Sequence, residues 1–338
     1  MVKRLFTIFA VLIVPCIALA IWFFVWLTTP ILPKTPEITI EKGMSLHAIA
    51  AKLSEQKIIS HPRAFVLYAQ ATGRGQELKA GVYLFDKAVT PQTVLDYLAK
   101  GVVYALKIRL IEGWTNLQMV NHLTTLPFIK IPNFKEEFLA LTKNAAFIKS
   151  LELYTPTLEG YLSPQTYYLA PGSQTADFLT AFVMEFKKVY QEALKDLTVL
   201  PSLSEHQIVT LASIIEKETG AEEERTIIAS VFYNRLDKGM LLQSDPTIIY
   251  GLKHFDGDIR KGDITHQNIY NTYVHKGLPP GPICNPGRAS IYAALHPAKT
   301  DYLFFVSKGN GTHYFSKTAK EHLEAVRKYQ IERTQIVQ

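Results

Sequence analysis

The feature that most constrains this fold is an uncharged apolar run near the N-terminus, from Leu5 to Leu27. A helix rises about 1.5 Å per residue, so this run is long enough to cross a hydrocarbon core of about 30 Å. Lys3 and Arg4 precede it. The positive-inside rule therefore predicts a cytoplasmic N-terminus, a single-pass anchor in the inner (cytoplasmic) membrane over residues 1–29, and a periplasmic or otherwise extracytoplasmic chain after Pro30.

The same run also resembles a secretory signal peptide, because Ala18-Leu19-Ala20 imitates a cleavage site. The apolar residues continue past this site through Trp22 and Trp26, which favours an uncleaved anchor. Cys16 follows Pro15 inside the run, a poor context for attachment of a lipid.

Composition limits the chemistry of the remaining chain. Cys284 is the only cysteine after the apolar run, so no disulfide can form within the ectodomain and no cysteine-based metal site is expected. The 10 histidines lack the spacing of metal-ligand motifs. We therefore expect neither a metal nor another cofactor. The net charge of +6 comes without a clustered basic run, which argues against nucleic acid as a partner.

Residues 30–338 are long enough for two domains. Three prolines predict a stiff linker over residues 30–37. A short strand, Ile38–Ile40, then precedes a helix with apolar residues at helical spacing from Leu46 to Leu53 and a second helical segment, Pro62–Thr72. The pattern predicts an α+β protein with a small α/β module over residues 38–101 and a larger mixed α+β domain over residues 102–338.

Two carboxylates end an apolar helix in the larger domain. Ser204 and Gln207 form a capping box at its start. On a wheel of about 100° per residue, Glu216 and Glu218 lie roughly 80° to either side of the apolar stripe, so periodicity cannot choose between them. A carboxyl held against apolar surface has the raised pKa that a general acid needs near neutral pH. The simpler alternative is two solvated residues beside the stripe. The stripe consists of Ile208, Leu211, Ala212 and Ile215.

A second helix is predicted from about Ala221 to Asp237, where Glu222, Glu223 and Glu224 would favour the helix dipole without any catalytic role. Asp245-Pro246 is typical of an N-cap followed by proline at the first helical position, which would make Asp245 structural.

Several ordered motifs resemble the membrane-anchored endolytic murein transglycosylases of the YceG-like family. They are LEGYLSPQTYYLAPG (158–172), ASIIEKET (212–219), VFYNRL (231–236), LQSDPTIIYG (242–251) and NTYVHKGLPPGPICNPG (271–287). The resemblance implies that the small module is LysM-like and that Glu216 is the catalytic residue. The chain departs from the family at Gln165, where an acidic residue is common, so no catalytic role is carried to that position.

The resemblance also implies the reaction and the partners. The substrate would be the nascent glycan strands of peptidoglycan, cut endolytically at the inner membrane near the peptidoglycan synthases. Glu216 would act as acid and then as base, leaving 1,6-anhydro-N-acetylmuramic acid ends without consuming water. Substrate-binding candidates with polar tips are Glu159, Glu218, Asn234, Gln243, Asp245, Tyr250, Asn271 and Tyr273.

Two alternatives remain open from the sequence. A hydrolytic muramidase would need a second carboxylate aimed at a water molecule, for which Glu159 and Asp245 are the candidates. A non-catalytic wall-binding scaffold would use only the anchor and the LysM-like module.

Overall fold

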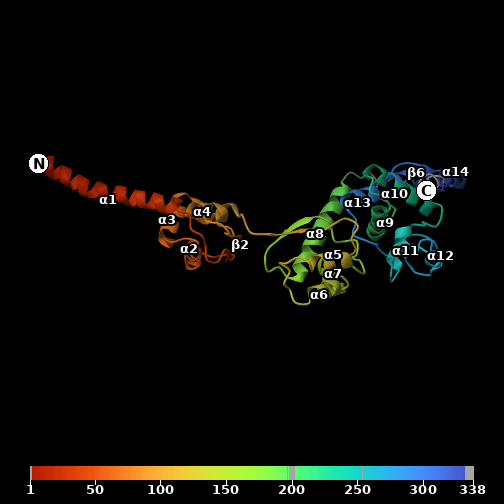
Figure 1. The fold of residues 1–338 in the computed structure, drawn as a ribbon, viewed down its shortest axis with the longest axis horizontal. Coiled ribbons are helices and arrows are strands. Elements are labelled where there is room, and N and C mark those ends of the chain that lie inside the picture. The colour runs from red at the N-terminus through yellow and green to blue at the C-terminus, as the bar shows by residue number, and fades with distance from the viewer. Residues whose placement is uncertain (1, 196, 198–201, 253, 332–338) are drawn as a thin grey trace. The chain divides into compact units, whose positions relative to one another are not determined.

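The computed structural model describes residues 2–195, 197, 202–252 and 254–331, with side chains described from residue 13 to residue 330. Most of the elements are helices, and the strands pair as three two-stranded sheets, β1-β2, β3-β4 and β5-β6. The predicted mixed α+β class is therefore confirmed. The chain forms two compact units: unit 1 is Met1–Lys107 with Tyr168–Gly172, and unit 2 is Ile108–Tyr167 with Ser173–Gln338 (Figure 1). The boundary predicted near Gly101 lies shortly before this division.

Unit 1 is a small helical module with one two-stranded antiparallel sheet. Strands β1 and β2 pair antiparallel with Ile38 opposite Tyr83. Ser45 caps α2 by accepting a hydrogen bond from the backbone N–H of Ala48, as its position before the apolar repeat indicates. The elements are α1 (Val2–Thr28), β1 (Glu37–Ile40), α2 (Leu46–Glu55), α3 (Pro62–Ala71), a 3-10 turn (Arg74–Gln76), β2 (Gly81–Leu84) and α4 (Pro91–Lys100).

The last turns of α1 belong to the core of unit 1. Trp26 is only 6% exposed and packs in the same cluster as Leu53 and Phe65. Its indole Nε1 donates a hydrogen bond of 3.1 Å to the Ser60 hydroxyl. Within the described part of the chain, no helix is both long enough and apolar enough to span a membrane. Because the predicted anchor begins at Leu5, its first side chains lie outside the described residues, and the anchor stays a prediction.

Unit 2 is larger and mainly helical. Strands β3 (Leu106–Arg109) and β4 (Thr166–Leu169) each contain residues of both units. The other elements of unit 2 are α5 (Asn116–Leu123), α6 (Phe134–Leu141), α7 (Ala145–Ser150), α8 (Thr175–Leu194), α9 (Glu205–Glu218), a 3-10 turn (Glu222–Glu224), α10 (Arg225–Asp237), α11 (Asp245–Gly251), α12 (Lys261–Thr265), α13 (Arg288–Leu295), β5 (Phe304–Ser307), β6 (His313–Ser316), α14 (Ala319–Val326) and a π-helical turn (Arg327–Ile331).

Helix α9 is the central element of unit 2. The predicted capping box of Ser204 and Gln207 is present in both directions. Every residue from Ile208 to Ile215 is buried, so the helix is enclosed on all sides rather than amphipathic. Neighbouring helices α10, α11 and α13 pack against it. Both flanks of its last turn therefore face protein. Glu216 and Glu218 are each partly buried, so neither is the fully solvated surface residue of the simpler alternative.

Two predicted helix starts need correction. The helix expected from Ala221 begins as a 3-10 turn, and α10 proper starts at Arg225. Helix α11 begins at Asp245 itself, so Ser244 rather than Asp245 is its N-cap. The Ser244 side chain makes no capping hydrogen bond because its hydroxyl is directed to Glu218 instead. Sequence could not show this, since the hydroxyl and the carboxyl meet only in the tertiary structure.

Candidate active site

Glu216 is held by the loop that precedes α13. Its carboxylate Oε2 accepts a hydrogen bond of 2.9 Å from the backbone N–H of Gly287. The Glu112 side chain lies directly against Gly287, because a Cβ placed on that glycine would lie 2.1 Å from Glu112 Oε1. Partial burial, followed by the charge of Glu216, raises the pKa of Glu112. Glu216 is thus a half-buried carboxylate that ties the end of α9 to a loop.

That loop is fastened to α9 and to the segment around Gly160. Ile283 N–H donates to the Ser213 hydroxyl over 3.0 Å. The Asn285 side-chain oxygen accepts hydrogen bonds from Gly160 N–H, at 3.0 Å, and from Leu162 N–H. The motifs at 158–172, 212–219 and 271–287, distant in sequence, therefore meet at one place in the fold. Gly287, and with it the contact to Glu216, has a fixed position.

Glu218 lies on the opposite flank of α9 and lines a cavity of about 410 Å³. Of the two glutamates, only Glu218 belongs to the described lining of this cavity. The Ser244 hydroxyl donates a hydrogen bond to Glu218 Oε1. Burial raises the pKa of Glu218 to about 7; the Asp245 charge raises it as well, while Ser244 and Arg235 act in the lowering direction. A carboxyl with such a pKa is partly protonated at neutral pH and can serve as a general acid.

Arg235 provides a fixed positive charge at this cavity. Its Nε donates to the Leu303 carbonyl over 2.6 Å, and its Nη1 donates to the Leu242 carbonyl over 2.8 Å. The guanidinium also lies over the ring of Phe304, 5.2 Å from the centroid. These contacts hold the buried guanidinium in one place. Its positive charge acts to lower the pKa of Glu218, although no ion pair joins the two side chains among the described contacts.

Asp245 and Tyr273 form a hydrogen-bonded pair in the lining of the same cavity. The Tyr273 hydroxyl donates a hydrogen bond of 2.6 Å to Asp245 Oδ1. Gln243, also in the lining, has a φ of +50°, a left-handed conformation that is uncommon for a residue with a side chain. Its N–H donates to the Thr272 carbonyl over 3.1 Å, which stabilises this conformation. Four predicted site residues are therefore brought together: Glu218, Gln243, Asp245 and Tyr273.

Two other predicted sugar contacts instead hold loops together. The Asn234 amide donates to the carbonyls of Thr300 and Tyr302, at 2.8 and 2.9 Å. The Asn271 amide is buried and donates to three backbone carbonyls, those of Asp263, Ile264 and His266. The amide N–H groups of both side chains therefore bond to backbone carbonyls of the protein. These bonds position the segment before β5 and the loop that carries Tyr273.

Glu159 and Tyr250 belong to a buried network around Asn285. Glu159 Oε1 accepts hydrogen bonds from Asn116 N–H at 3.0 Å and from the Asn285 amide at 3.3 Å. Burial raises the pKa of Glu159 to about 7, with Asn116 and Tyr250 acting to lower it. The Tyr250 and Tyr270 rings pack with centroids 4.8 Å apart. The contacts of Glu159 are those of a carboxyl that organises the interior.

Sequence reasoning missed Arg235 in the lining of the cavity, and Ser244 and Glu224, which bond to the lining residues Glu218 and His313. Glu224 is buried and accepts a 2.8 Å hydrogen bond from His313 N–H, and its other oxygen lies 2.7 Å from His313 Nδ1. The sequence predicted only a favourable interaction of Glu224 with a helix dipole. In the structure, Glu224 also holds His313 in place. The sequence does contain an indication for Arg235. A charged residue within the largely apolar stretch VFYNRL is expected to be buried only if its guanidinium is hydrogen-bonded inside the protein.

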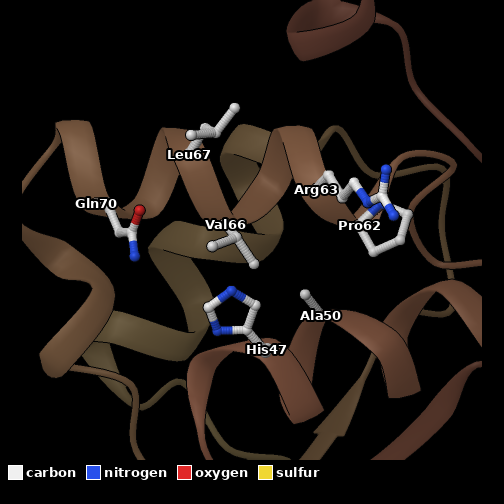
Figure 2. Close-up of a pocket in the computed structure, with 7 residues that line it drawn as sticks. All are labelled: His47, Ala50, Pro62, Arg63, Val66, Leu67 and Gln70. Atoms are coloured by element: carbon white, nitrogen blue, oxygen red, sulfur yellow. The ribbon is translucent and has the colours of Figure 1, made fainter.

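Unit 1 has a cavity of a different kind, about 490 Å³ in volume. Figure 2 shows side chains of α2 and α3 on its two sides: His47, Ala50, Pro62, Arg63, Val66, Leu67 and Gln70. No carboxyl occurs in this described lining, so the cavity offers no acid for glycosidic bond cleavage. The cavity in unit 2, by contrast, is lined by the carboxyls of Glu218 and Asp245.

Comparison with known proteins agrees with the motifs that converge on α9. The profile of the YceG-like family matches residues 38–328, which includes both units from β1 onward. The chain belongs to the YceG-like family. It is 37% identical over 313 residues to the endolytic murein transglycosylase of Bacillus subtilis, covering 87% of this chain and 85% of that protein.

More distant members of the family extend the comparison. The endolytic murein transglycosylase of Streptococcus pneumoniae strain R6 is 28% identical, and the alignment covers 84% of this chain but 56% of that longer protein. A crystal structure of a yceG-like protein from Listeria monocytogenes superposes with a TM-score of 0.57 at 32% identity, covering 85% of this chain and 97% of that one. The family relationship thus holds at the level of sequence and of fold.

Proposed function

We propose that this protein is a membrane-anchored endolytic lytic transglycosylase that cleaves the β-1,4 bond between N-acetylmuramic acid and N-acetylglucosamine in peptidoglycan. Family membership and the name shared by its relatives support the activity. The observation that carries the site is the carboxyl of Glu218, with a pKa of about 7, in a cavity shared with Asp245 and Tyr273. We assign the acid to Glu218 rather than to Glu216, which the resemblance had indicated.

The first step is protonation of the leaving group. Ser244 donates to Oε1 of Glu218, so the other carboxyl oxygen is the one that can carry the acid proton toward a glycosidic oxygen. Protonated Glu218 gives this proton to the β-1,4 oxygen, and the bond from that oxygen to C1 of N-acetylmuramic acid breaks. The N-acetylglucosamine side leaves as an alcohol.

The second step closes the anhydro ring. Glu218 is now a carboxylate, which the nearby Arg235 charge and the Ser244 hydrogen bond favour. It takes the proton from the C6 hydroxyl of the same N-acetylmuramic acid residue, and that oxygen attacks C1. Glu218 ends protonated, as it began, and no water is consumed. One carboxyl is sufficient for both steps.

A hydrolytic muramidase is the second candidate, because Asp245 provides another carboxylate in the lining of the same cavity. Hydrolytic glycosidases use two carboxyls, one as acid and one as base or nucleophile. Mass spectrometry of products from purified glycan strands separates the two reactions. We expect 1,6-anhydro ends; reducing ends in their place would establish hydrolysis, and intact strands would leave only a binding role.

We further propose that the Leu5 to Leu27 run anchors the protein in the inner membrane with unit 2 outside the cytoplasm, near the peptidoglycan synthases. Lys3 and Arg4 before the run support this topology. A reporter that is active only outside the cytoplasm, fused after Gln338, should be active, and the protein should keep its N-terminus. A soluble form starting near Ile21 would instead show a cleaved signal peptide.

The module of residues 38–101 is proposed to hold glycan strands, as a LysM-like module would. The open cavity between α2 and α3 is one place where such a strand could lie (Figure 2). Binding of peptide-free glycan strands by the full chain should weaken when Arg63 is replaced by alanine, with the thermal melt unchanged. Unaltered binding would mean that this cavity takes no part.

A further inference from the structure

His313, the first residue of β6, lies in the wall of the Glu218 cavity and is held there from behind. Its side chain is 12% exposed and belongs to the described lining. Its Nδ1 lies 2.7 Å from Glu224 Oε2, and its backbone N–H donates to Oε1 of the same carboxyl over 2.8 Å. Glu224 is buried and is not in that lining. The imidazole is therefore fastened to a residue behind the cavity wall.

The contact with Glu224 decides which ring nitrogen of His313 can meet a ligand. A carboxylate only accepts hydrogen bonds, so Nδ1 carries the hydrogen of this pair. In the neutral imidazole the free lone pair is then on Nε2. The two nitrogens point away from each other across the ring, so Nε2 is directed away from Glu224. One buried contact thus sets both the tautomer and the direction of the ring.

The Nε2 atom of His313 is accessible as well as unpaired. The bond to Glu224 is the one described hydrogen bond of this ring. Nε2 is nevertheless not among the buried side-chain atoms that lack a partner in the described part of the chain, so it keeps accessible surface. His322 lines the same cavity but differs, because its unpaired Nδ1 is enclosed by protein. Nε2 of His313 is therefore available to a molecule in the cavity.

Aromatic neighbours hold the His313 ring in this orientation. The Phe305 ring meets it almost at a right angle, with planes 87° apart and centroids 5.4 Å apart. Phe315 lies on the same strand, with its ring centroid 6.4 Å from that of His313. A side chain that is already ordered loses little conformational entropy when a ligand binds. A hydrogen bond to Nε2 is thus made by a group that is already in place.

We propose that His313 Nε2 accepts a hydrogen bond from a hydroxyl of the N-acetylhexosamine unit bound beside Glu218, and so contributes to substrate binding. This inference rests on the proposed function. The lining combines the aromatic rings of Tyr273 and Phe305 with polar side chains, as sites that hold the apolar and hydroxylated sides of a sugar do. The hairpin of β5 and β6 then completes the substrate site.

Two substitutions of His313 in the full-length protein separate its two nitrogens. In His313→Asn the side-chain amide can take the place of Nδ1 and donate to Glu224, whereas nothing replaces Nε2. With a defined glycan oligomer as substrate, we expect KM to rise about three- to tenfold, the loss of one hydrogen bond, while kcat changes less than about twofold.

His313→Gln makes the opposite change. Its longer side chain can bring an amide oxygen to the place of Nε2, but it gives up the bond from Nδ1 to Glu224. We therefore expect His313→Gln to have a KM closer to that of wild type and a lower melting temperature than His313→Asn. A merely structural role predicts the reverse, since KM would then follow the loss of stability.

His296→Asn is the matched control. The Nδ1 of His296 bonds to the Tyr292 carbonyl over 3.0 Å, and its Nε2 is buried without a described partner, so asparagine again keeps the first contact and removes the second nitrogen. His296 is not in the described lining of the Glu218 cavity. This variant should leave KM unchanged. Thermal melts establish that all three variants are folded.

The results separate this inference from the proposed function. If wild-type protein releases 1,6-anhydro ends and His313→Asn has the wild-type KM, or if His296→Asn raises KM equally, the role of His313 is overturned. A larger KM for His313→Gln than for His313→Asn would also overturn it. If wild-type protein releases no such ends, the proposed function fails, and direct binding of the oligomer still decides the inference. Equal dissociation constants for wild type and His313→Asn, or no binding by wild type, would then overturn it.

Discussion

The two flanks of the last turn of α9 carry the same functional group in opposite surroundings. On one flank, Glu216 accepts a hydrogen bond from Gly287 N–H and lies near the carboxyl of Glu112. On the other, Glu218 accepts from the Ser244 hydroxyl and lines a cavity. The first carboxylate fastens a loop to a helix, and the second faces a space that a substrate can enter.

This difference shows that position on a helix does not decide what a carboxyl does. Two residues apart on one helix, both glutamates have the same intrinsic acidity and the same dipole. The contacts supplied by α10, α11 and the loop before α13 make them different. The following experiments compare the two flanks, beginning with the largest expected effect.

Glu218→Gln should lower kcat at least about 100-fold, because the amide cannot donate the acid proton and general acid catalysis contributes about 10²- to 10⁴-fold. The Gln side chain can still accept the Ser244 hydrogen bond, so the fold is expected to remain. Release of anhydro-muropeptides measures the effect. Near wild-type release by folded Glu218→Gln would remove Glu218 from the mechanism and return the acid role to Glu216.

Glu218→Gln should also stabilise the protein at alkaline pH. The pKa of Glu218 is about 7 when folded against an ordinary value of 4.5, so the folded state binds more protons between these values and wild type loses stability as pH rises through them. The variant lacks this loss. We expect its free energy of unfolding to exceed that of wild type by up to about 3 kcal/mol at pH 8 to 9, and to converge with it below pH 4.5.

Chemical denaturation of unit 2 at several pH values measures this difference. A free energy of unfolding for Glu218→Gln that stays equal to that of wild type at pH 8 to 9 would contradict the raised pKa of Glu218.

Activity should fall as pH rises through about 7, since only protonated Glu218 can act as the acid. Ser244→Ala should move this alkaline limb to higher pH, because the Ser244 hydrogen bond stabilises the charged carboxylate and lowers its pKa. The pH dependence of kcat/KM for both proteins tests this. A limb that moves to lower pH, or a wild-type limb far from 7, would contradict the assignment.

Glu216→Gln should have the smallest effect on catalysis. The Gln side-chain oxygen can still accept the Gly287 hydrogen bond, so kcat should stay within about threefold of wild type. Initial rates under the conditions used for Glu218→Gln provide the comparison. A loss as large as that of Glu218→Gln would show that both flanks are needed for the reaction.

Local patterns predicted much of the secondary structure. The capping box at Ser204, the helix after Ser45 and the strand at Ile38 are all confirmed, because each depends on residues close together in the sequence. The start of α11 was displaced by one residue because the Ser244 hydroxyl and Glu218 come together only through folding. Glu224 was underestimated for the same reason, since its partner His313 follows much later in the chain.

The sequence by itself determined the family, the existence of α9 and the two candidate carboxyls at its end. It also placed Gln243, Asp245 and Tyr273 among the candidate substrate contacts, because these motifs are recognisable as strings of residues. The tertiary structure decided which flank of α9 faces the cavity, and the burial of that flank raises the pKa of Glu218 to about 7. That difference depends on desolvation and on charges such as Arg235, which only the folded chain places beside α9, and no helical period contains that information.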